Sequence, residues 1–222
     1  MTYSAIILLG GNATRFGSDI NKVYKLINNK AICAYSLDLF LSDCDCNEVI
    51  VVYNPKDKDI LNELLINYPS VFKTIGGNKR SKSVLEGLKI ATNDIVFVHD
   101  GARPNININD IKALKDAIKD CDAVALGVPV TDTIKRQSAE KVETVSRDNL
   151  YAIQTPQVSN RNLLLSALTE INDDIDITDD LMALERYHNC KCKIVLGSKT
   201  NIKVTTEEDY QYLKYLMGDR NV

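Results

Sequence analysis

The first half of the chain alternates short apolar segments with segments of helical spacing. The apolar segments, mostly β-branched, are Ser4–Leu9, Val49–Tyr53, Val71–Ile75, Ile95–His99 and Ala123–Val128. Between them, the spacing predicts helices over Ala31–Ser42, Asp57–Asn67, Ser81–Ala91 and Asn109–Lys119. Continuously apolar strands separated by helices indicate a parallel sheet that is covered on both faces. The pattern therefore predicts an α/β fold with a Rossmann-like, three-layer, mostly parallel sheet.

The segment Thr131–Tyr151 interrupts this pattern. Its polar, turn-like centre, Gln137–Glu140, lies between two alternating stretches, which is typical of a β-hairpin. Because the segment has little apolar surface of its own, we expect it to protrude as an arm. Beyond it, the sequence predicts helices over Asn160–Thr169 and Asp179–Tyr187, a strand over Cys192–Leu196 and a last helix over Glu207–Met217. With no repeat, low-complexity tract or linker, residues 1–222 are expected to form a single domain with the arm (131–151) inserted in it.

Composition narrows the possible partners. The net charge of -3 argues against a general nucleic-acid or membrane binder, and no apolar run approaches the roughly 20 residues that cross a bilayer. The N-terminal MTYSAIILLGG has no basic region before its apolar run, so we expect no cleaved signal peptide. The pairs Cys44/Cys46 and Cys190/Cys192 are C-x-C, not the C-x-x-C of a zinc site. We expect reduced thiols in a cytoplasmic protein.

Three loops follow the predicted strands and carry unusual chemistry: Gly10–Gly17, Gly76–Arg80 and Asp100–Pro104. Ligands of open α/β sheets bind at the carboxyl ends of the strands, and these loops share that edge. The first loop, GGNATRFG, does not fit two familiar phosphate-binding types. A Walker loop ends in Gly-Lys-Ser/Thr, whereas here Ser18 follows the last glycine. A dinucleotide-binding loop needs further glycines and an acidic residue after the second strand, where the chain has Asn54.

A nucleoside triphosphate cradle that carries its own cations fits this loop better. Gly10 and Gly11 let the backbone approach phosphates closely because no Cβ intervenes. Successive backbone N–H groups in such a loop form an anion-binding concavity. Arg15 and Lys22 add full positive charges where the negative charge of the phosphates must be stabilised.

A series of motifs, in order along nearly the whole chain, resembles the 2-C-methyl-D-erythritol 4-phosphate cytidylyltransferase family. The motifs are L-x-G-G-x-x-x-R-x-G from Leu8, then Lys22, Gly76-Gly77, H-D-G-A-R-P at His99–Pro104, T-D-T-I-K at Thr131–Lys135, Q-T-P-Q at Gln154–Gln157, T-D-D at Thr178–Asp180 and N-I-K-V-T at Asn201–Thr205. The chain departs from the family pattern where the family usually has Gly, Pro and Gln, with Ala13, Asn21 and Val23 in those places. The resemblance implies a fold of the nucleotidyltransferase type.

The resemblance also implies the reaction. CTP and 2-C-methyl-D-erythritol 4-phosphate give 4-diphosphocytidyl-2-C-methyl-D-erythritol and pyrophosphate, in the non-mevalonate pathway to isoprenoids. A phosphomonoester has its second pKa near ~6, so it is largely a dianion at pH 7 and needs no general base. We therefore leave His99 and His188 out of the chemistry and expect His99 to shape its loop. Catalysis of this kind is almost entirely positioning and electrostatics.

By the same resemblance, the candidate site residues fall into four roles. Arg15 and Lys22 are the catalytic cations that hold the triphosphate. The nucleotide is bound by Gly10, Gly11, Asn12, Gly76, Gly77, Asn78 and Ser83. The sugar-alcohol phosphate is bound by Asp100, Arg103, Thr133, Arg147 and Lys203. Asp100 is also the candidate ligand of a divalent cation, Mg²⁺. Since Thr133 and Arg147 lie in the arm, which in the family reaches the partner subunit's site, a homodimer is implied.

Three alternatives remain open. A ribitol 5-phosphate cytidylyltransferase has a similar body, but those proteins have H-D-S-V-R-P at the aspartate loop. Gly101-Ala102 and the arm motifs T-D-T-I-K and S-R-D-N-L-Y favour methylerythritol phosphate. A dinucleotide-binding oxidoreductase is tested by titration with NADH. A non-catalytic nucleotide-binding protein is tested by CTP-dependent release of pyrophosphate, and the presence together of Arg15, Lys22, Asp100 and Lys203 argues against it.

Overall fold

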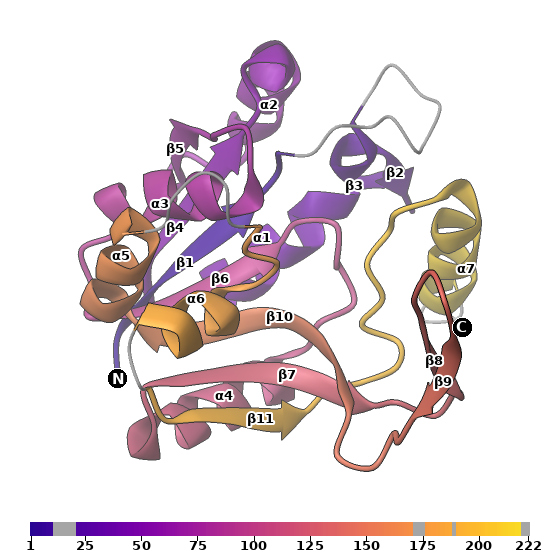
Figure 1. Ribbon diagram of the computed structural model, residues 1–222. Coiled ribbons are helices and arrows are strands. Elements are labelled where there is room, and N and C mark those ends of the chain that lie inside the picture. Colours follow the sequence, from indigo (N-terminus) through magenta and orange to yellow (C-terminus); the bar gives the residue numbers. More distant parts are fainter. Residues whose placement is uncertain (11–20, 171–175, 188–189, 219–222) are drawn as a thin grey trace.

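The computed structural model describes residues 1–10, 21–170, 176–187 and 190–218, and a seven-stranded sheet forms its centre (Figure 1). The strands lie in the order β11-β7-β10-β6-β1-β4-β5. Their bounds are β1 Tyr3–Leu8, β4 Cys46–Tyr53, β5 Phe72–Ile75, β6 Ile95–Asp100, β7 Ala123–Pro129, β10 Tyr151–Asn160 and β11 Cys192–Leu196. All neighbouring strands of this sheet pair in parallel except β10, which is antiparallel to both β6 and β7. The mostly parallel α/β sheet expected from the sequence is confirmed.

The antiparallel strand β10 is the element that the apolar pattern did not predict. It contains Pro156, which lacks an N–H and argues against a central strand. The sheet accommodates this proline where the register with β7 shifts, between Ile153 and Gln157. The sequence analysis did not predict this strand because the proline interrupts its pattern, and the irregularity of the ladder leaves room for the proline.

Helices cover both faces of the sheet. One face carries α1 Ile32–Ser42, α2 Lys58–Leu65 and α4 Ile108–Ala117, and the other carries α3 Arg80–Ile90, α5 Arg161–Glu170 and α6 Asp180–Tyr187. Side chains of β1 alternate between the two cores: Ala5 and Ile7 belong to the first, and Ile6 and Leu8 to the second. This alternation is why β1, buried on both sides, is apolar at nearly every position.

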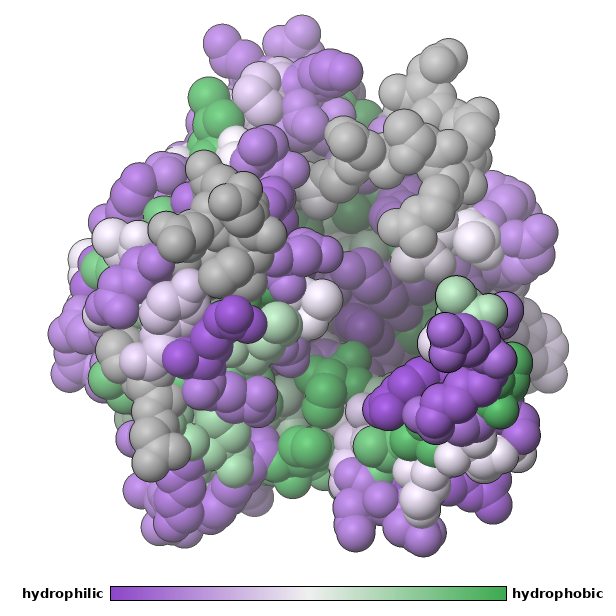
Figure 2. Space-filling model, in the orientation of Figure 1, coloured by the Kyte–Doolittle hydropathy of each residue, from purple (hydrophilic) through white to green (hydrophobic). Residues whose placement is uncertain are grey.

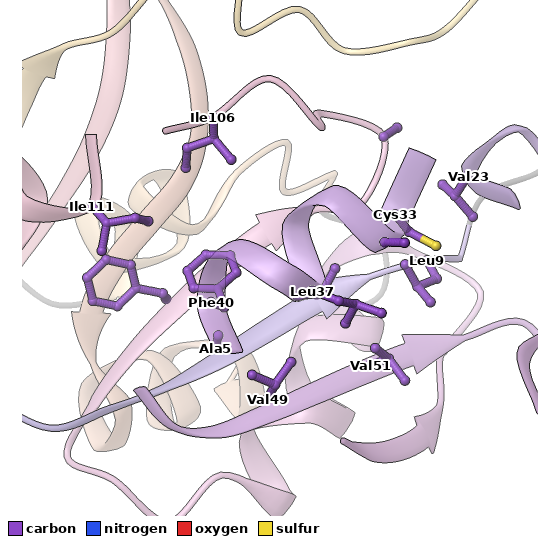
Figure 3. Packing of buried hydrophobic residues seen from close by; sticks show 14 of the residues in the cluster. Ala5, Leu9, Val23, Cys33, Leu37, Phe40, Val49, Val51, Ile106 and Ile111 are labelled. Carbon is purple, nitrogen blue, oxygen red and sulfur yellow. The ribbon is translucent and has the colours of Figure 1, made fainter. Parts of the chain in front are cut away.

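The first of these cores is packed around α1. Figure 3 shows Leu37 and Phe40 of α1 above Ala5, Val49 and Val51 of the sheet. All five side chains are buried. Burying a large apolar side chain contributes about 1.5–3 kcal/mol relative to leaving it exposed. This packing makes the sheet a rigid base for the loops that follow its strands.

The last helix, α7 Glu207–Gly218, packs outside the two main layers. It closes over a short hairpin of β2 Leu26–Ile27 and β3 Lys30–Ala31, which follows the 3-10 turn η2 Lys22–Tyr24. The hydroxyl of Tyr210 donates to the carbonyl of Leu26 at 2.6 Å. The segment that begins with Lys22 is thus fixed to the body of the protein by α7.

The arm segment forms a separate two-stranded antiparallel ladder, β8 Ile134–Gln137 with β9 Val142–Val145. Figure 1 shows it outside the central sheet, beyond the end of β7. Most of its side chains are exposed. Within the described residues, none of the helices is long and apolar enough to pass through a bilayer.

Candidate active site

The carboxyl ends of four neighbouring strands meet at one edge of the sheet. Leu8 of β1 lies beside both Val52 of β4 and Asp100 of β6, and Tyr53 of β4 lies beside Ile75 of β5. The loops that follow these strands surround a cavity of ≈ 550 Å³, which we call the first hollow. The predicted site residues that line it are Gly10, Lys22, Gly76, Gly77, Asn78, Ser83, Asp100 and Lys203. Figure 2 shows this face hollowed at its centre, with hydrophilic residues in its depth.

A second cavity, of ≈ 700 Å³, adjoins the first on the side of β10. We call it the second hollow. Arg80, Asp100 and Lys203 line both hollows, and Arg103 and Thr155 line the second alone. The two cavities therefore share a border of three charged side chains. Two anionic ligands, one in each cavity, could meet at this border.

Other predicted residues lie elsewhere. Gly11, Asn12 and Arg15 fall outside the described residues. Thr133 and Arg147 belong to the arm, are exposed, and line neither hollow. Arg147 donates from Nη1 to the carbonyl of Thr131, within the arm itself.

The double-glycine loop after β5 turns back on the first turn of α3. A Cβ at Gly77 would collide with the Cβ of Lys82, and one at Gly76 would lie 2.8 Å from the Oγ of Ser83. Ser83 is buried, and its hydroxyl donates to the carbonyl of Lys79 at 3.2 Å. Only glycine fits this close approach, so the loop presents backbone groups, rather than side chains, at the wall of the first hollow.

Asn21 explains how the chain manages without the proline usual in the family at this position. Its side-chain amide donates to the carbonyl of Leu9 at 2.8 Å and to Asp57 at 2.9 Å, while its Oδ1 accepts from the N–H of Val23 at 3.4 Å. These bonds fix the residue before Lys22 to the end of β1 and to the turn after β4. Hydrogen bonds therefore fix the backbone here, where proline would restrict it covalently.

Asp100 lies among three cations. Lys203 Nζ is 2.8 Å from its Oδ2, Arg103 Nε is 3.7 Å from the same oxygen, and Arg80 Nε is 3.5 Å from its Oδ1. Its side chain is only 10% exposed. Burial raises the pKa of Asp100, but Arg80, Lys203 and Arg103 outweigh it and hold that pKa well below its usual range. The carboxylate is ionised throughout the neutral range, and of the three cations around it Arg80 is also paired with a second carboxylate, Asp180.

Arg80 and Asp180 are site residues that the sequence reasoning missed. Arg80 begins α3 and Asp180 begins α6, and their side chains form a bidentate pair of 2.7 and 3.1 Å. The amide N–H of Asp180 in turn donates to Gln157 of β10 at 2.8 Å. The T-D-D motif at Thr178–Asp180 was noted, but nothing local in the sequence points to a partner 100 residues away.

His99 lies behind the aspartate loop and not in either hollow. Its Nε2 is 3.0 Å from the carbonyl of Arg103, and its Nδ1 is 3.1 Å from the hydroxyl of Thr155. Because the carbonyl of Arg103 can only accept, the proton of the ring is on Nε2, and Nδ1 accepts from the Thr155 hydroxyl, which itself accepts the N–H of Asp100 at 3.0 Å. Burial lowers the pKa of His99 to about 4. The ring is neutral and fixes the backbone of the loop, as the sequence reasoning expected.

The donor set at the first hollow fits a metal ion held mainly by phosphates. Asp100 is the one carboxylate among the described residues that line it. Over the part of the chain that the structure describes, no three His, Cys, Asp or Glu side chains come together as a metal cage. Mg²⁺ is commonly held by one or two carboxylates together with substrate phosphates and water, and a single aspartate satisfies that pattern.

Comparison with known proteins gives one consistent family. The family model described as IspD: 2-C-methyl-D-erythritol 4-phosphate cytidylyltransferase matches residues 3–219. Proteins with that name in Bacillus velezensis and Lachnospira eligens are 35% and 38% identical to the chain, over 100% and 94% of its length and 100% and 96% of theirs.

Solved structures agree with this family. The fold matches 4-diphosphocytidyl-2C-methyl-D-erythritol synthase of Anaerococcus prevotii with a TM-score of 0.87, at 27% identity and 98% coverage of both chains. It matches 2-C-methyl-D-erythritol 4-phosphate cytidylyltransferase of Francisella tularensis with a TM-score of 0.82, at 30% identity, over 97% of this chain and 99% of that one.

Proposed function

The chain belongs to the 2-C-methyl-D-erythritol 4-phosphate cytidylyltransferase family, and from that membership we propose how its residues carry the reaction. The protein is a nucleotidyltransferase that transfers a cytidylyl group from CTP to 2-C-methyl-D-erythritol 4-phosphate. The products are 4-diphosphocytidyl-2-C-methyl-D-erythritol and pyrophosphate, and the reaction belongs to the non-mevalonate pathway. The observation that carries the site assignment is the border of Arg80, Asp100 and Lys203 between two adjoining hollows.

The first hollow is assigned to CTP. Gly76, Gly77, Asn78 and Ser83 lie on its wall, where backbone groups meet the hydrogen-bonding edge of a pyrimidine and a ribose. Lys22 lines the same cavity, and the chain that follows it is fixed at Val23 by Asn21 and at Leu26 by Tyr210 of α7. We assign Lys22, with Arg15, to the triphosphate and to the charge that develops at the α-phosphorus.

The second hollow is assigned to the alcohol phosphate. Arg103 and Lys203 supply its positive charge. Arg103 Nη1 already donates to the carbonyl of Asn201 at 2.8 Å, but its buried Nε finds no hydrogen-bond partner among the described residues, since 3.7 Å to Asp100 is too long. A phosphate or hydroxyl oxygen of the substrate would satisfy this donor. Asp100, an ionised acceptor, would take a hydrogen bond from a substrate hydroxyl.

The chemistry follows from these positions. A phosphate oxygen of methylerythritol phosphate attacks the α-phosphorus of CTP, the new P–O bond forms, and the bond to the β-phosphate oxygen breaks with release of pyrophosphate. The attacking phosphate is already a dianion, so no side chain has to remove a proton. The neutral, fully engaged ring of His99 agrees with this, because it faces neither hollow. The protein contributes alignment and positive charge.

We propose Mg²⁺ as the divalent cation of this site, with Asp100 as its protein ligand. Its Oδ1, with Arg80 at 3.5 Å, is the less engaged of its two oxygens, while Oδ2 accepts from Lys203. Because Oδ1 has two lone pairs, it can face the ion with one and accept from a substrate hydroxyl with the other. When bound, the ion supplies neutralisation of charge across the triphosphate. The test is cytidylyl transfer after chelation with EDTA and titration with Mg²⁺, Mn²⁺ or Ca²⁺. Full turnover in the chelated enzyme would remove the metal from the proposal.

We also propose that the protein is a homodimer in which the arm completes the partner's site. Two observations support this. Thr133 and Arg147, implied by the family resemblance to bind the alcohol phosphate, lie outside both hollows of their own chain. Next to the second hollow, Tyr151, Ile194 and Leu196 are 40%, 44% and 70% exposed, an apolar surface that this chain leaves uncovered. Figure 2 shows apolar atoms exposed below the central hollow.

We further propose that the protein works in the cytoplasm. Its six cysteines are all free thiols. Burial raises the pKa of Cys33 to about 12, which keeps that thiol protonated and unreactive. Thiols persist in the reducing cytosol, and isolation of the protein with all six reactive to a thiol reagent after denaturation would agree with this location.

One assay tests the proposed function. Pyrophosphate release is followed with CTP and either methylerythritol 4-phosphate or ribitol 5-phosphate as acceptor. Methylerythritol phosphate is expected to support turnover with a kcat/KM at least tenfold above that of ribitol phosphate, which corresponds to about 1.4 kcal/mol of discrimination. Faster turnover with ribitol phosphate, or none with either acceptor, would contradict the proposal.

A further inference from the structure

The pair Arg80–Asp180 has a feature that its contribution to folding does not explain. Asp180 is 3% exposed, whereas Arg80 is 21% exposed and lines both hollows, so forming the pair removes the carboxylate almost completely from water. A buried ion pair is often no more stabilising than apolar side chains of the same size. Arg80 also lies in the first turn of α3, where the helix dipole disfavours a cation. The pair therefore requires a reason beyond stability.

The geometry divides the guanidinium of Arg80 between two carboxylates. Its terminal nitrogens Nη1 and Nη2 both go to Asp180, at 2.7 and 3.1 Å. Only Nε faces Asp100, at 3.5 Å from Oδ1, which is long for a hydrogen bond. A bidentate fork on a carboxylate is the strongest arrangement available to arginine, and here Asp180 occupies it.

We propose that Asp180 is a positioning residue that holds the guanidinium fork of Arg80 away from Asp100, and thereby keeps Asp100 free to accept a hydrogen bond from the alcohol phosphate. If Asp180 lost its charge, Arg80 Nη1 and Nη2 would turn to the nearest remaining carboxylate. That carboxylate is Asp100, whose Oδ2 is already engaged by Lys203 at 2.8 Å. The guanidinium would then occupy Oδ1 of Asp100, the last oxygen on the border of the two hollows that can accept a hydrogen bond from the substrate.

This inference rests on the proposed assignment of Asp100 to the second substrate, and two variants test it by steady-state kinetics. Asp180→Asn is expected to raise the KM for methylerythritol phosphate roughly ten- to hundred-fold, the equivalent of one hydrogen bond to a charged group. In Asp180→Glu a carboxylate is still present for the fork of Arg80, so at least half of that loss, on a logarithmic scale, is expected to return. If Asp180 only stabilised the fold, the KM for methylerythritol phosphate would be unchanged in every variant that folds.

Asp43→Asn is the matched control. Asp43 is another buried carboxylate, paired with Lys115 at 2.9 Å, but it lies at the opposite edge of the sheet. Its loss is expected to lower the melting temperature without changing either KM. An Asp180→Asn enzyme whose KM for the alcohol phosphate stays within twofold of wild type, or an Asp43→Asn enzyme with the same rise, would overturn the inference.

Two further measurements keep the test independent of folding and of the assigned reaction. A crystal structure of Asp180→Asn is expected to show Arg80 Nη1 and Nη2 within hydrogen-bond distance of Asp100, whichever substrate the enzyme uses. An Arg80 that stays on residue 180 would refute the inference even if cytidylyl transfer were established. If Asp180→Asn does not fold, Asp180→Ser, which also lacks the charge, is measured in its place: a tenfold rise in the KM for the alcohol phosphate supports the inference, and a KM within twofold of wild type overturns it.

Discussion

Asp100 and Asp43 are both buried carboxylates at the ends of the same sheet, and their surroundings are opposite. At the carboxyl edge, one ionised group, Asp100, faces the three cations Arg80, Arg103 and Lys203. At the amino edge, two acidic groups, Asp43 and Asp45, share Lys115.

The hydrogen bonds at the two carboxylates differ in the same way. Asp43 accepts from Lys115 on both oxygens, from the hydroxyl of Tyr3 at 3.0 Å and from the N–H of Asp45 at 3.1 Å. Its acceptors are filled. Asp100 has one short contact, to Lys203, and an Oδ1 with only a distant neighbour in Arg80.

This difference teaches how to separate a binding carboxylate from a structural one. Burial and an ion pair are common to both and do not distinguish them. What distinguishes Asp100 is an excess of cations, an unfilled acceptor and a cavity on each side. Arg80 is balanced by Asp180, so Arg103 and Lys203 outnumber Asp100 by one positive charge, which a bound phosphate would neutralise.

The largest expected effect separates the lysines of the two edges. Lys22→Ala is expected to lower kcat roughly 10²–10³-fold, with a smaller change in the KM for CTP, because its contact strengthens as charge develops. Lys115→Ala leaves Asp43 buried without its cation, so it is expected to lose on the order of 2 kcal/mol of stability and no activity. Kinetics and thermal melts on both variants check this. Near-normal turnover of Lys22→Ala, with Lys58→Ala as the exposed control, would remove Lys22 from the mechanism.

The second prediction concerns His99, a residue at the carboxyl edge of the sheet that stabilises the fold and does not bind substrate. The neutral His99 has its pKa lowered by burial to about 4, below the unfolded value near 6.5. The unfolded chain therefore gains a proton first as pH falls, and stability present above pH 6.5 is lost between pH 6.5 and 4, by up to about 3 kcal/mol. Urea unfolding at pH 7.5 and 4.5 measures it. In His99→Gln this component of the pH dependence is expected to vanish; an unchanged pH dependence would contradict the assignment.

The third prediction concerns the arm. If each site combines Lys22 of one chain with Arg147 of its partner, the variants Lys22→Ala and Arg147→Ala are each nearly inactive. Co-refolded in equal amounts, half of the dimers are mixed, and each mixed dimer has one site with both lesions and one with neither. Activity is then expected to return to roughly a quarter of wild type, from the symmetry of the dimer. If both residues served a site within one chain, verified heterodimers would remain inactive.

The sequence predicted most of the fold because its strands are buried on both faces. A local run of apolar residues is enough to predict a buried strand. The bounds of β11, Cys192–Leu196, were predicted to the residue. The loops carrying Gly10, Gly76 and Asp100 could be placed together because parallel strands end at one edge. Lys203 was assigned to the site by the family resemblance alone. The strand β10 was missed because Pro156 interrupts its pattern.

The contacts inside the site were less predictable than its location. Arg80 and Asp180 meet across 100 residues, and each alone is an ordinary charged residue at the start of a helix. The role of Asn21 depends on Leu9 and Asp57, which only the folded chain brings to it. Local patterns fix where loops gather; the pairing of polar side chains within them depends on tertiary geometry.

The smallest expected effect is a kcat that does not depend on pH above pH 7. With a dianionic nucleophile and no general base, kcat is expected to stay within about twofold between pH 7 and 9 at saturating metal. Asp100 does not disturb this range, because its pKa is lowered and it stays ionised from neutral pH downward until well into acid. His99 does not either, since its charged form arises only near pH 4.

Below pH 7 the rate is expected to fall as the substrate phosphate protonates near ~6. A pH–rate profile measured with constant ionic strength checks both limbs. A rise of tenfold between pH 7 and 9 would reveal a titrating base at the carboxyl edge of the sheet, and the site would then transfer protons as well as position charge.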